Sequence, residues 1–496
     1  MKTNSLDFDA QALREKILDL AMRGKLVPQD PNDEPASVLL DKIKAEKAEL
    51  IKEKKIKKTK SLPPITDDEK PFDIPDSWEW VRLGDVGNWA AGATPSRKHP
   101  EYYGGNIPWL KTGDLNDDVV EDTTEKITKL GVENSSVKIN KPGNVLIAMY
   151  GATIGKLGIV GNKELVTNQA CCGCTPFNGV YNWYLFYYLF ASRKRLIDLG
   201  SGGAQPNISK QKIENFSFPL PPLSEQSRIA AKIAQLFALL RKVESSTQQY
   251  AKLQTLLKTK VLDLAMRGKL VKQDPNDEPT SVLLEKIKAE KAELIKEKKI
   301  KKSKPLPPIT DEEKPFDIPD SWEWVRLGDL TAPVEYAMAD GPFGSNLKKT
   351  DYTLDHEVRI IQLSNIGENG WKDQNVKYTT FEHLKSIQRS EVFPGNIVIA
   401  KMMPAGRAII VPNKDKKYVL SSDAVKFIPD THIYKDFLIY AINSNTYRDQ
   451  VNEKLQGTTR PRTSLKKLKN FLIPLPPFDE QKRIVTKTFD LFNMIG

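Results

Sequence analysis

The chain contains an internal repeat that constrains its fold more than any other feature of the sequence. Residues 17–85 and 261–329 align without a gap at an offset of 244, and all but seven of the 69 aligned positions are identical. A second repeat pairs residues 219–226 (PLPPLSEQ) with residues 474–481 (PLPPFDEQ) at an offset of 255. The chain therefore alternates constant and variable segments, and its fold must be built from two related units.

The two offsets also relate the ends of the chain to its middle. Gly496 corresponds to Arg241 and Met1 corresponds to Ser245, so only three residues of the repeat lie between these positions. We therefore expect a pseudo-two-fold circular arrangement, in which the two terminal segments together rebuild what the central segment forms alone.

The central constant segment has the periodicity of helices. Apolar residues recur at spacings of three and four over residues 224–243, with Ser224 as a plausible N-cap, and again over residues 250–270. We expect one long helix or a helical pair here, copied by residues 478–495 together with residues 8–26. Two such elements should pack antiparallel and act as a spacer.

The variable segments combine short strand-like runs with turns. Residues 144–149 and 396–400 each follow a Pro-Gly pair and predict strands, whereas residues 182–199 and 434–455 predict helices. The shared landmarks indicate one fold with divergent surfaces. The predicted domains are an N-terminal conserved helical region (1–71), a first variable domain (72–222), a central conserved helical region (223–315), a second variable domain (316–477) and a C-terminal conserved helix (478–496).

The charge of the chain is concentrated in two places. Residues 42–60 and 286–304 each hold nine lysines and three glutamates, which gives +12 together, whereas the whole chain carries +11. Helices predicted from Ser37 and from Ser281 run into these segments. A solvated helix face is the favoured interpretation, and contacts with a partner or with DNA phosphates stay open.

The composition excludes several classes of protein. No apolar run approaches the ~20 residues of a membrane span, and the N-terminus has no signal-peptide pattern. Three cysteines in 496 residues do not make a disulfide scaffold. These features predict a soluble, cytoplasmic protein.

Motifs for catalysis are weak. The GATIGK sequence at residues 151–156 has three residues between its glycines instead of four, and Leu157 follows the lysine, so it does not fit a nucleotide-binding loop. A glycine turn whose bare backbone N–H groups can approach a phosphate closely fits it better. Cys171, Cys172 and Cys174 are interpreted as ordinary thiols, and the four histidines are scattered. We expect no catalytic residue and no metal, and an autonomous methyltransferase or nuclease is disfavoured.

The order of the segments resembles the specificity subunit of type I restriction–modification systems. The resemblance rests on the duplicated LAMRGKLV, on IPDSWEWVRLGD before each variable segment, on the PLPPLSEQ and PLPPFDEQ motifs after them, and on IPWLKTGDL at residues 107–115. It implies an α+β fold, with two mixed α/β target recognition domains separated by long antiparallel conserved helices.

The resemblance also implies a function. Each recognition domain would bind one half of a bipartite site on double-stranded DNA. The conserved helices would dock two methylation subunits for adenine methylation, and restriction subunits would join through them. S-adenosylmethionine would sit on the methylation partner, so this chain would carry no cofactor and would not be catalytic. The alternative is a duplicated protein-binding adaptor without sequence-specific DNA readout.

Loops rich in small polar and basic residues are the expected DNA contacts. Arginine fits guanine, Asn and Gln fit adenine, and Lys, Ser and Thr more often hold phosphate. In the first domain these residues are Thr94, Ser96, Arg97, Lys98, Lys111, Thr112, Thr153, Lys156, Gln205, Asn207 and Lys210. In the second domain they are Ser345, Asn346, Lys348, Gln362, Ser364, Asn365, Lys401, Arg407, Thr458, Thr459, Arg460, Arg462 and Lys466.

The constant segments supply two more predictions. Residues of the LAMRGKL motif could serve helix packing or partner docking, and the candidates for docking are Met22, Arg23, Leu26, Met266, Arg267 and Leu270. The four tryptophans Trp78, Trp80, Trp322 and Trp324 precede the variable segments in both copies, and we expect them to anchor those domains and not to read bases.

Overall fold

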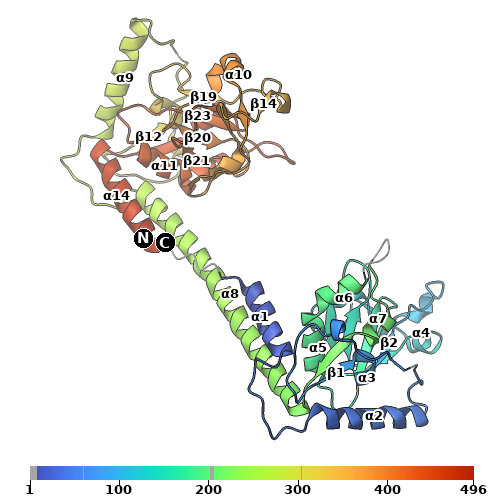
Figure 1. Ribbon diagram of the computed structural model, residues 1–496. Coiled ribbons are helices and arrows are strands. Elements are labelled where there is room, and N and C mark those ends of the chain that lie inside the picture. The colour runs from blue at the N-terminus through green and yellow to red at the C-terminus, as the bar shows by residue number, and fades with distance from the viewer. Residues whose placement is uncertain (1–7, 60, 201–205, 303) are drawn as a thin grey trace. The chain divides into compact units, whose positions relative to one another are not determined.

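The central constant segment forms a single helix, α8 (Leu223–Met266), in the computed structural model (Figure 1). Its 44 residues contain no glycine or proline, so nothing interrupts the helical hydrogen bonds. Ser224 is not the N-cap that the sequence predicted, because Leu223 is already helical. The Ser224 hydroxyl instead donates to Asp33 Oδ1 at 2.8 Å.

The structure describes residues 8–59, 61–200, 206–302 and 304–496, and it divides the chain into two units, residues 2–247 and 248–496. Each unit combines helices with sheets. None of the helices in the described ranges is long and apolar enough to cross a membrane.

A shorter helix lies alongside α8 in each unit (Figure 1). In the first unit α1 (Ala10–Met22) pairs with α8 through an ion pair between Arg14 and Glu244 at 2.5 Å. Further along the chain, Gln29 Nε2 donates to Glu225 on α8 at 2.5 Å. Since the residue numbers of the two partners change in opposite directions, the pairing is antiparallel.

The second unit repeats this pairing with α14 (Phe478–Ile495). Gln254 Nε2 donates to the Ile495 carbonyl at 2.7 Å, and Gln273 Nε2 donates to Glu480 at 2.6 Å. The predicted antiparallel packing of conserved helices is therefore confirmed within each unit.

The segments before and after each variable domain form a two-stranded neck. In the first unit β1 (Glu79–Arg82) pairs antiparallel with β11 (Ser217–Leu220). In the second unit β12 (Glu323–Arg326) pairs with β24 (Leu472–Leu475). The duplicated motifs therefore close each domain where the chain enters and leaves it.

The first variable domain contains two sheets, with strand orders β2-β10-β7-β8-β4 and β5-β3-β9-β6. Its strands are β2 (Gly87–Ala91), β3 (Tyr103–Leu110), β4 (Asp118–Val120), β5 (Glu125–Ile127), β6 (Ile139–Asn140), β7 (Val145–Ala148), β8 (Leu157–Val160), β9 (Leu165–Thr167) and β10 (Cys171–Pro176). Its helices are α3 (Leu83–Val86), α4 (Lys129–Glu133), α5 (Asn182–Ala191), α6 (Arg193–Gly200) and α7 (Lys210–Glu214).

The second variable domain repeats this architecture with sheets β13-β23-β20-β21 and β14-β18-β15-β22-β19 and a small β16-β17 pair. Its strands are β13 (Met338–Asp340), β14 (Tyr352–Thr353), β15 (Val358–Ile361), β16 (Ile366–Gly367), β17 (Gly370–Trp371), β18 (Tyr378–Thr379), β19 (Glu391–Val392), β20 (Ile397–Ala400), β21 (Ala408–Ile410), β22 (Tyr418–Leu420) and β23 (Ala424–Phe427). Its helices are α10 (Phe381–Ser386), α11 (Lys435–Asn443), α12 (Asn445–Glu453) and α13 (Leu465–Asn470).

Most local predictions hold. The two strands after Pro-Gly are β7 and β20, and each predicted domain helix is present but broken once, as α5–α6 and α11–α12. The lysine-rich segments begin as helices α2 (Ala36–Lys52) and α9 (Thr280–Lys296). The GATIGK turn connects two antiparallel strands, β7 and β8, and a nucleotide-binding loop needs a helix at that point.

The cysteines are ordinary buried thiols, as predicted. Cys171, Cys172 and Cys174 all lie on β10 and are free. Burial raises the pKa of Cys172 to about 12, so the thiol stays protonated.

Candidate nucleic-acid interface

In each variable domain, five loops converge at one edge, which we call the loop edge. It comprises residues 92–98, 111–114, 149–156, 168–170 and 206–210 in the first domain, and residues 341–349, 362–365, 400–407, 421–423 and 456–466 in the second. The convergence follows from strand pairing. β3 and β9 are parallel neighbours, as are β15 and β22, so the loops that follow them leave the same edge of the sheet.

Backbone hydrogen bonds hold the loops of the first domain together. They run from Gly92 N to Cys171 O at 3.0 Å, from Asn168 N to Leu110 O at 2.9 Å, from Met149 N to Ala170 O at 2.7 Å and from Ile208 N to Met149 O at 2.8 Å. The loop edge is therefore a braced surface whose side chains point from fixed positions.

The second domain makes the same contacts with different residues. The bonds run from Gly341 N to Ala424 O at 3.0 Å, from Ser421 N to Ile361 O at 2.9 Å, from Lys401 N to Asp423 O at 2.8 Å and from Thr463 N to Lys401 O at 2.8 Å. Matching these bonds makes Lys111 equivalent to Gln362 and Gln169 equivalent to Ser422. One backbone frame thus presents two different sets of side chains.

The predicted DNA contacts of both domains lie on these loops, with one outside the described residues. Exposed members are Thr94, Ser96, Arg97, Lys98, Asn207, Ser345, Asn346, Lys348, Thr458, Thr459, Arg460, Arg462 and Lys466. Partly buried members are Lys111, Thr112, Thr153, Lys156, Lys210, Gln362, Ser364, Lys401 and Arg407. Gln205 lies outside the described residues.

Asn365 differs from the other predicted contacts. Its side chain is fully buried. The amide donates to the carbonyls of Lys372 at 3.0 Å and Gln374 at 2.7 Å, and its oxygen accepts from Gln362 N at 2.8 Å. In this conformation Asn365 braces the turn and offers no free group to a base, so we leave it out of the contact set.

Cations on the first loop edge are paired with an acid. Arg97 and Lys111 both contact Glu125, at 2.9 Å and 2.5 Å. The hydrogen bond from Lys111, together with that from Arg97, holds the pKa of Glu125 below its usual value. A DNA phosphate would have to compete with this carboxylate for both cations.

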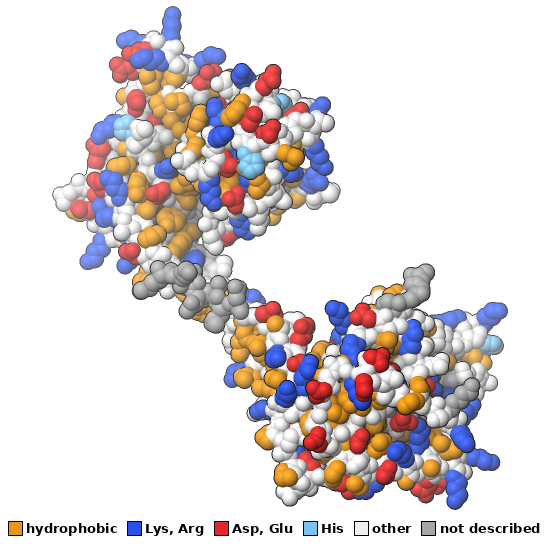
Figure 2. Space-filling view, viewed as in Figure 1, with side chains coloured by type: hydrophobic (Ala, Val, Ile, Leu, Met, Phe, Trp, Pro, Cys, Tyr) orange, Lys and Arg blue, Asp and Glu red, His pale blue; other side chains and the backbone are white. Residues whose placement is uncertain are grey.

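The second loop edge has similar pairs. Lys401 Nζ lies 2.7 Å from Asp340 Oδ1, and Arg407 pairs with Glu368. Burial lowers the pKa of Arg407. On the face seen in Figure 2, basic and acidic side chains are intermixed over both units. Recognition by such a surface depends on the placement of individual groups more than on net charge.

The loops 168–170 and 421–423 are the part of the site that the sequence analysis missed. They carry Gln169 in the first domain and Ser422 with Asp423 in the second, and they contain neither a glycine nor a cation. Only the parallel pairing of β9 and β22 with their neighbours brings these short loops to the loop edge.

Residues of the LAMRGKL motif lie mostly inside the chain's own core. Met22 and Met266 are buried, so in this conformation they are not accessible to a partner. Leu26 and Leu270 pack against the same cores.

The two arginines of this motif have equivalent settings. Arg23 bonds to Asp19 at 2.6 Å and lies over the Phe72 ring, and Arg267 bonds to Asp263 at 2.7 Å and lies over the Phe316 ring. Together these contacts favour helix packing as the role of the motif.

The tryptophans anchor the domains, as predicted. Trp78 and Trp322 are buried and donate to the carboxylates of Glu225 and Glu480, each at 2.9 Å. Burial raises the pKa of Glu225, which accepts from Gln29 as well. Trp80 and Trp324 pack against Phe72 and Phe316.

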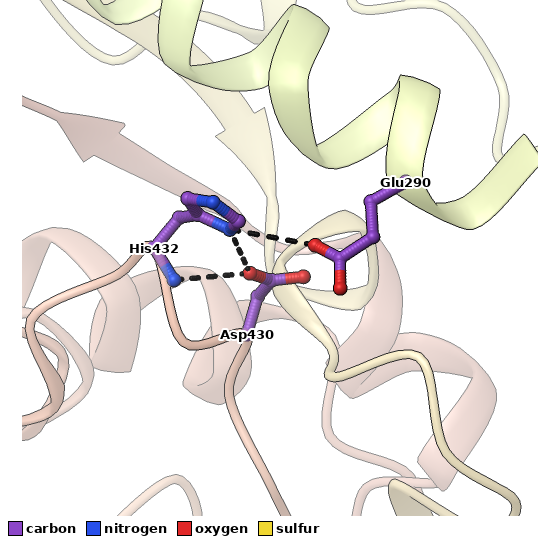
Figure 3. Close-up of side chains that lie close together, drawn as sticks. All are labelled: Glu290, Asp430 and His432. Carbon is purple, nitrogen blue, oxygen red and sulfur yellow. Dashed lines mark hydrogen bonds and ion pairs between the residues drawn. The ribbon is translucent and has the colours of Figure 1, made fainter. Parts of the chain in front are cut away.

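Among the residues that the structure describes, one cluster of metal-ligating groups occurs outside the loop edge (Figure 3). Glu290 on α9 lies 3.7 Å from His432 Nδ1, which is 2.9 Å from the buried Asp430. The sequence showed no such grouping, because Glu290 lies 140 positions before Asp430. In the first unit the equivalent Glu46 accepts two hydrogen bonds from Asn178. We therefore interpret the cluster as a contact between α9 and its variable domain.

Comparison with known protein families finds the same family twice in the chain. The family described as the type I restriction modification DNA specificity domain matches residues 75–254 and residues 319–495, once in each half. Together these ranges cover well over half of the chain.

Two Escherichia coli proteins are similar over nearly the whole chain. The type I restriction enzyme EcoAI specificity subunit is 34% identical over 98% of this chain and 89% of its own length. The EcoEI specificity subunit is 30% identical over 98% of this chain and 90% of its own length.

Solved structures share the fold. An HsdS subunit from Thermoanaerobacter tengcongensis has a TM-score of 0.51 at 18% identity and covers 86% of this chain and 92% of its own. A second solved structure is described as the structural basis of complex assembly and conformational transition of the type I R-M system. It has a TM-score of 0.56 at 20% identity, with the same coverage.

Proposed function

The chain belongs to the type I restriction–modification DNA specificity family, and on that premise we propose that each variable domain reads one half of an asymmetric, bipartite DNA site. The chain would itself be non-catalytic. It would place two methylation subunits for adenine methylation, and restriction subunits would join through them.

One observation carries this proposal. The same five loops converge in both domains and are braced by equivalent backbone hydrogen bonds, but their exposed side chains differ. A duplicated frame with different side chains suits two readers of the same kind of ligand with different base preferences. Arg, Gln and Asn at the loop edges can read base edges, while Lys, Ser and Thr position the phosphates.

The constant helices supply the second part of the proposal. α8 continues without interruption between the two units, and each unit adds one antiparallel partner helix. A continuous helix is stiffer than a flexible linker, so it would set the gap between the two half-sites. Its exposed apolar residues, including Leu253, Leu256 and Leu257, are candidates for docking the methylation subunits.

Selection of bound DNA from a random pool tests the proposal, using the full chain together with its methylation subunit. We expect enrichment of two short, different motifs at a fixed gap. Enrichment of a single motif, or of two motifs at variable gaps, would contradict the split reader.

Failure to enrich any motif while the methylation subunit still binds would favour the duplicated protein-binding adaptor. The measurement should be repeated at several salt concentrations, because phosphate contacts make affinity fall with salt for all sequences alike. Base preference that persists at high salt separates sequence reading from general attraction.

A further inference from the structure

The fourth loop of each loop edge, residues 168–170 and 421–423, holds side chains that the packing of the fold does not explain. Gln169 is exposed, and its one hydrogen bond among the described residues comes from the Thr94 hydroxyl. Asp423 is partly exposed, and within the described ranges its carboxylate accepts only from Ser422 Oγ, at 3.2 Å.

The second domain has a cleft at this place. Its volume is about 350 Å³, and its lining includes Gln362, Ser364, Ser421, Ser422 and Asp423. The hydroxyls of Ser364 and Ser421 are buried and have no hydrogen-bond partner among the described residues. Buried polar groups in proteins are nearly always paired, so unpaired hydroxyls beside a cleft indicate that a polar ligand completes them.

Asp423 limits what that ligand can be. The loop edge around it carries cations suited to phosphate, but a carboxylate repels phosphate and can only accept hydrogen bonds. On the major-groove edge of DNA, a carboxylate accepts from the cytosine N4 amino group. Asp423 is therefore unsuited to contact the DNA phosphates and well suited to accept a hydrogen bond from a base edge.

The equivalent loop in the first domain has different chemistry. Ala170 occupies the position of Asp423, and the amide of the neighbouring Gln169 lies beside Thr94. An amide that donates and accepts fits the N6 and N7 atoms of adenine. The two loops thus occupy equivalent positions, but they offer different hydrogen-bonding groups to a base.

We propose that Asp423 selects a cytosine in the half-site of the second domain and that Gln169 selects an adenine in the half-site of the first. This inference rests on the proposed DNA-reading function and assigns base specificity to one loop of each reader.

Replacement of Asp423 by asparagine tests this assignment. The variant and the native chain, each with the methylation subunit, are used to select DNA from a random pool. We expect one position of the second half-site to lose its cytosine preference by about tenfold or more, with the first half-site and the gap unchanged. The other positions of the second half-site should also stay unchanged, which shows that the second domain of the variant is folded.

Two further variants sharpen the result. Gln169→Ala should relax one adenine position of the first half-site and leave the second half-site intact. Asp436→Asn removes an equal charge on α11, in a groove beside α14 and away from the loop edge, and should change no base preference.

The outcomes separate this inference from the function on which it rests. If the native chain selects two half-sites and Asp423→Asn selects the same ones, the assignment of Asp423 is wrong and the split reader stands. If Asp423→Asn relaxes a position at which the native chain does not select cytosine, the base assignment is also wrong. If the native chain selects no motif, both proposals fail.

Discussion

Single residues of the constant segments make the same contacts in both copies. The buried Arg82 donates to the carbonyls of Pro63 at 3.0 Å and Pro64 at 2.8 Å and pairs with Glu69 at 2.7 Å. Arg326 makes the same contacts in the second unit. One arginine thus fixes a proline-rich segment that has almost no secondary structure of its own.

Glu69 gives this contact a pH dependence. Hydrogen bonds from Arg82 lower its pKa from 4.5 to about 2. Because the pKa is lower in the folded state, the stabilisation is complete above pH 4.5 and is lost as the pH falls toward 2. In thermal unfolding, Glu69→Gln should have a lower Tm than the native chain at neutral pH, and the difference should shrink over that range.

The exposed Asp76 in the same unit provides the control, since Asp76→Asn should leave Tm nearly unchanged at every pH. A Tm difference for Glu69→Gln that stayed constant into the acid range would show that the charge of Glu69 is not what stabilises the segment.

Glu125 competes with any phosphate for the cations of the proposed DNA interface. Its carboxylate holds both Arg97 and Lys111, so Glu125→Gln should free two cations and strengthen DNA binding. A gain of a few-fold is expected, because partly exposed ion pairs contribute about 0.2–1 kcal/mol. Titration of DNA at several salt concentrations measures it, and the gain should shrink as salt rises.

Glu133→Gln on α4 removes the same charge outside the loop edge and is the matched control. An equal gain from both variants would mean that only net charge matters, and a loss of affinity in Glu125→Gln would mean that Glu125 positions the cations productively.

At the scale of elements, the repeated motifs lie where one helix or domain ends and the next segment begins. Gly24 and Gly268 end the helices before them at φ +67° and +66°, a conformation that favours glycine, and a Cβ at either would lie 2.4 Å from a proline ring. The Gln of each PLPP motif, Gln226 or Gln481, is buried and bonds the variable domain to the helix that follows.

Gln226→Leu should therefore destabilise the first unit. The substitution leaves Tyr181 N and the carbonyls of Gly179 and Pro221 without their partner. A loss of about 2–4 kcal/mol in the free energy of unfolding is expected for these buried groups. Urea unfolding followed by circular dichroism measures it, with the exposed Gln248→Ala on α8 as a neutral control. If the free energy of unfolding fell no more than in the control, water would have replaced the hydrogen bonds of the Gln226 amide.

Sequence patterns predicted the elements better than their assembly. The periodicity of residues 224–243 gave the helix, but its continuity through α8 depends on the absence of any breaker, which a search for apolar stripes does not register. Small polar and basic residues identified four loops of each candidate site. The loop at residues 168–170 was missed because the parallel pairing of β3 with β9 joins distant segments, and the burial of Asn365 could not be predicted because it depends on the same kind of assembly.

For the whole molecule, the central claim is that two copies of one reader recognise two different half-sites. Four strands of each sheet come in the same order in both domains, and the loop bracing and neck strands are shared, while the loops differ in sequence. If this is right, recognition is modular, and each half of the DNA site belongs to one variable segment.

A chain with two identical variable segments tests this claim most directly. Residues 86–216 would replace residues 330–471, with both junctions next to the shared LGD motif and the neck strands. With the methylation subunit, this chain should select the first half-site on both sides of the native gap, as inverted copies if the predicted pseudo-two-fold arrangement holds. Selection of the original asymmetric site, or of one half-site alone, would contradict the account.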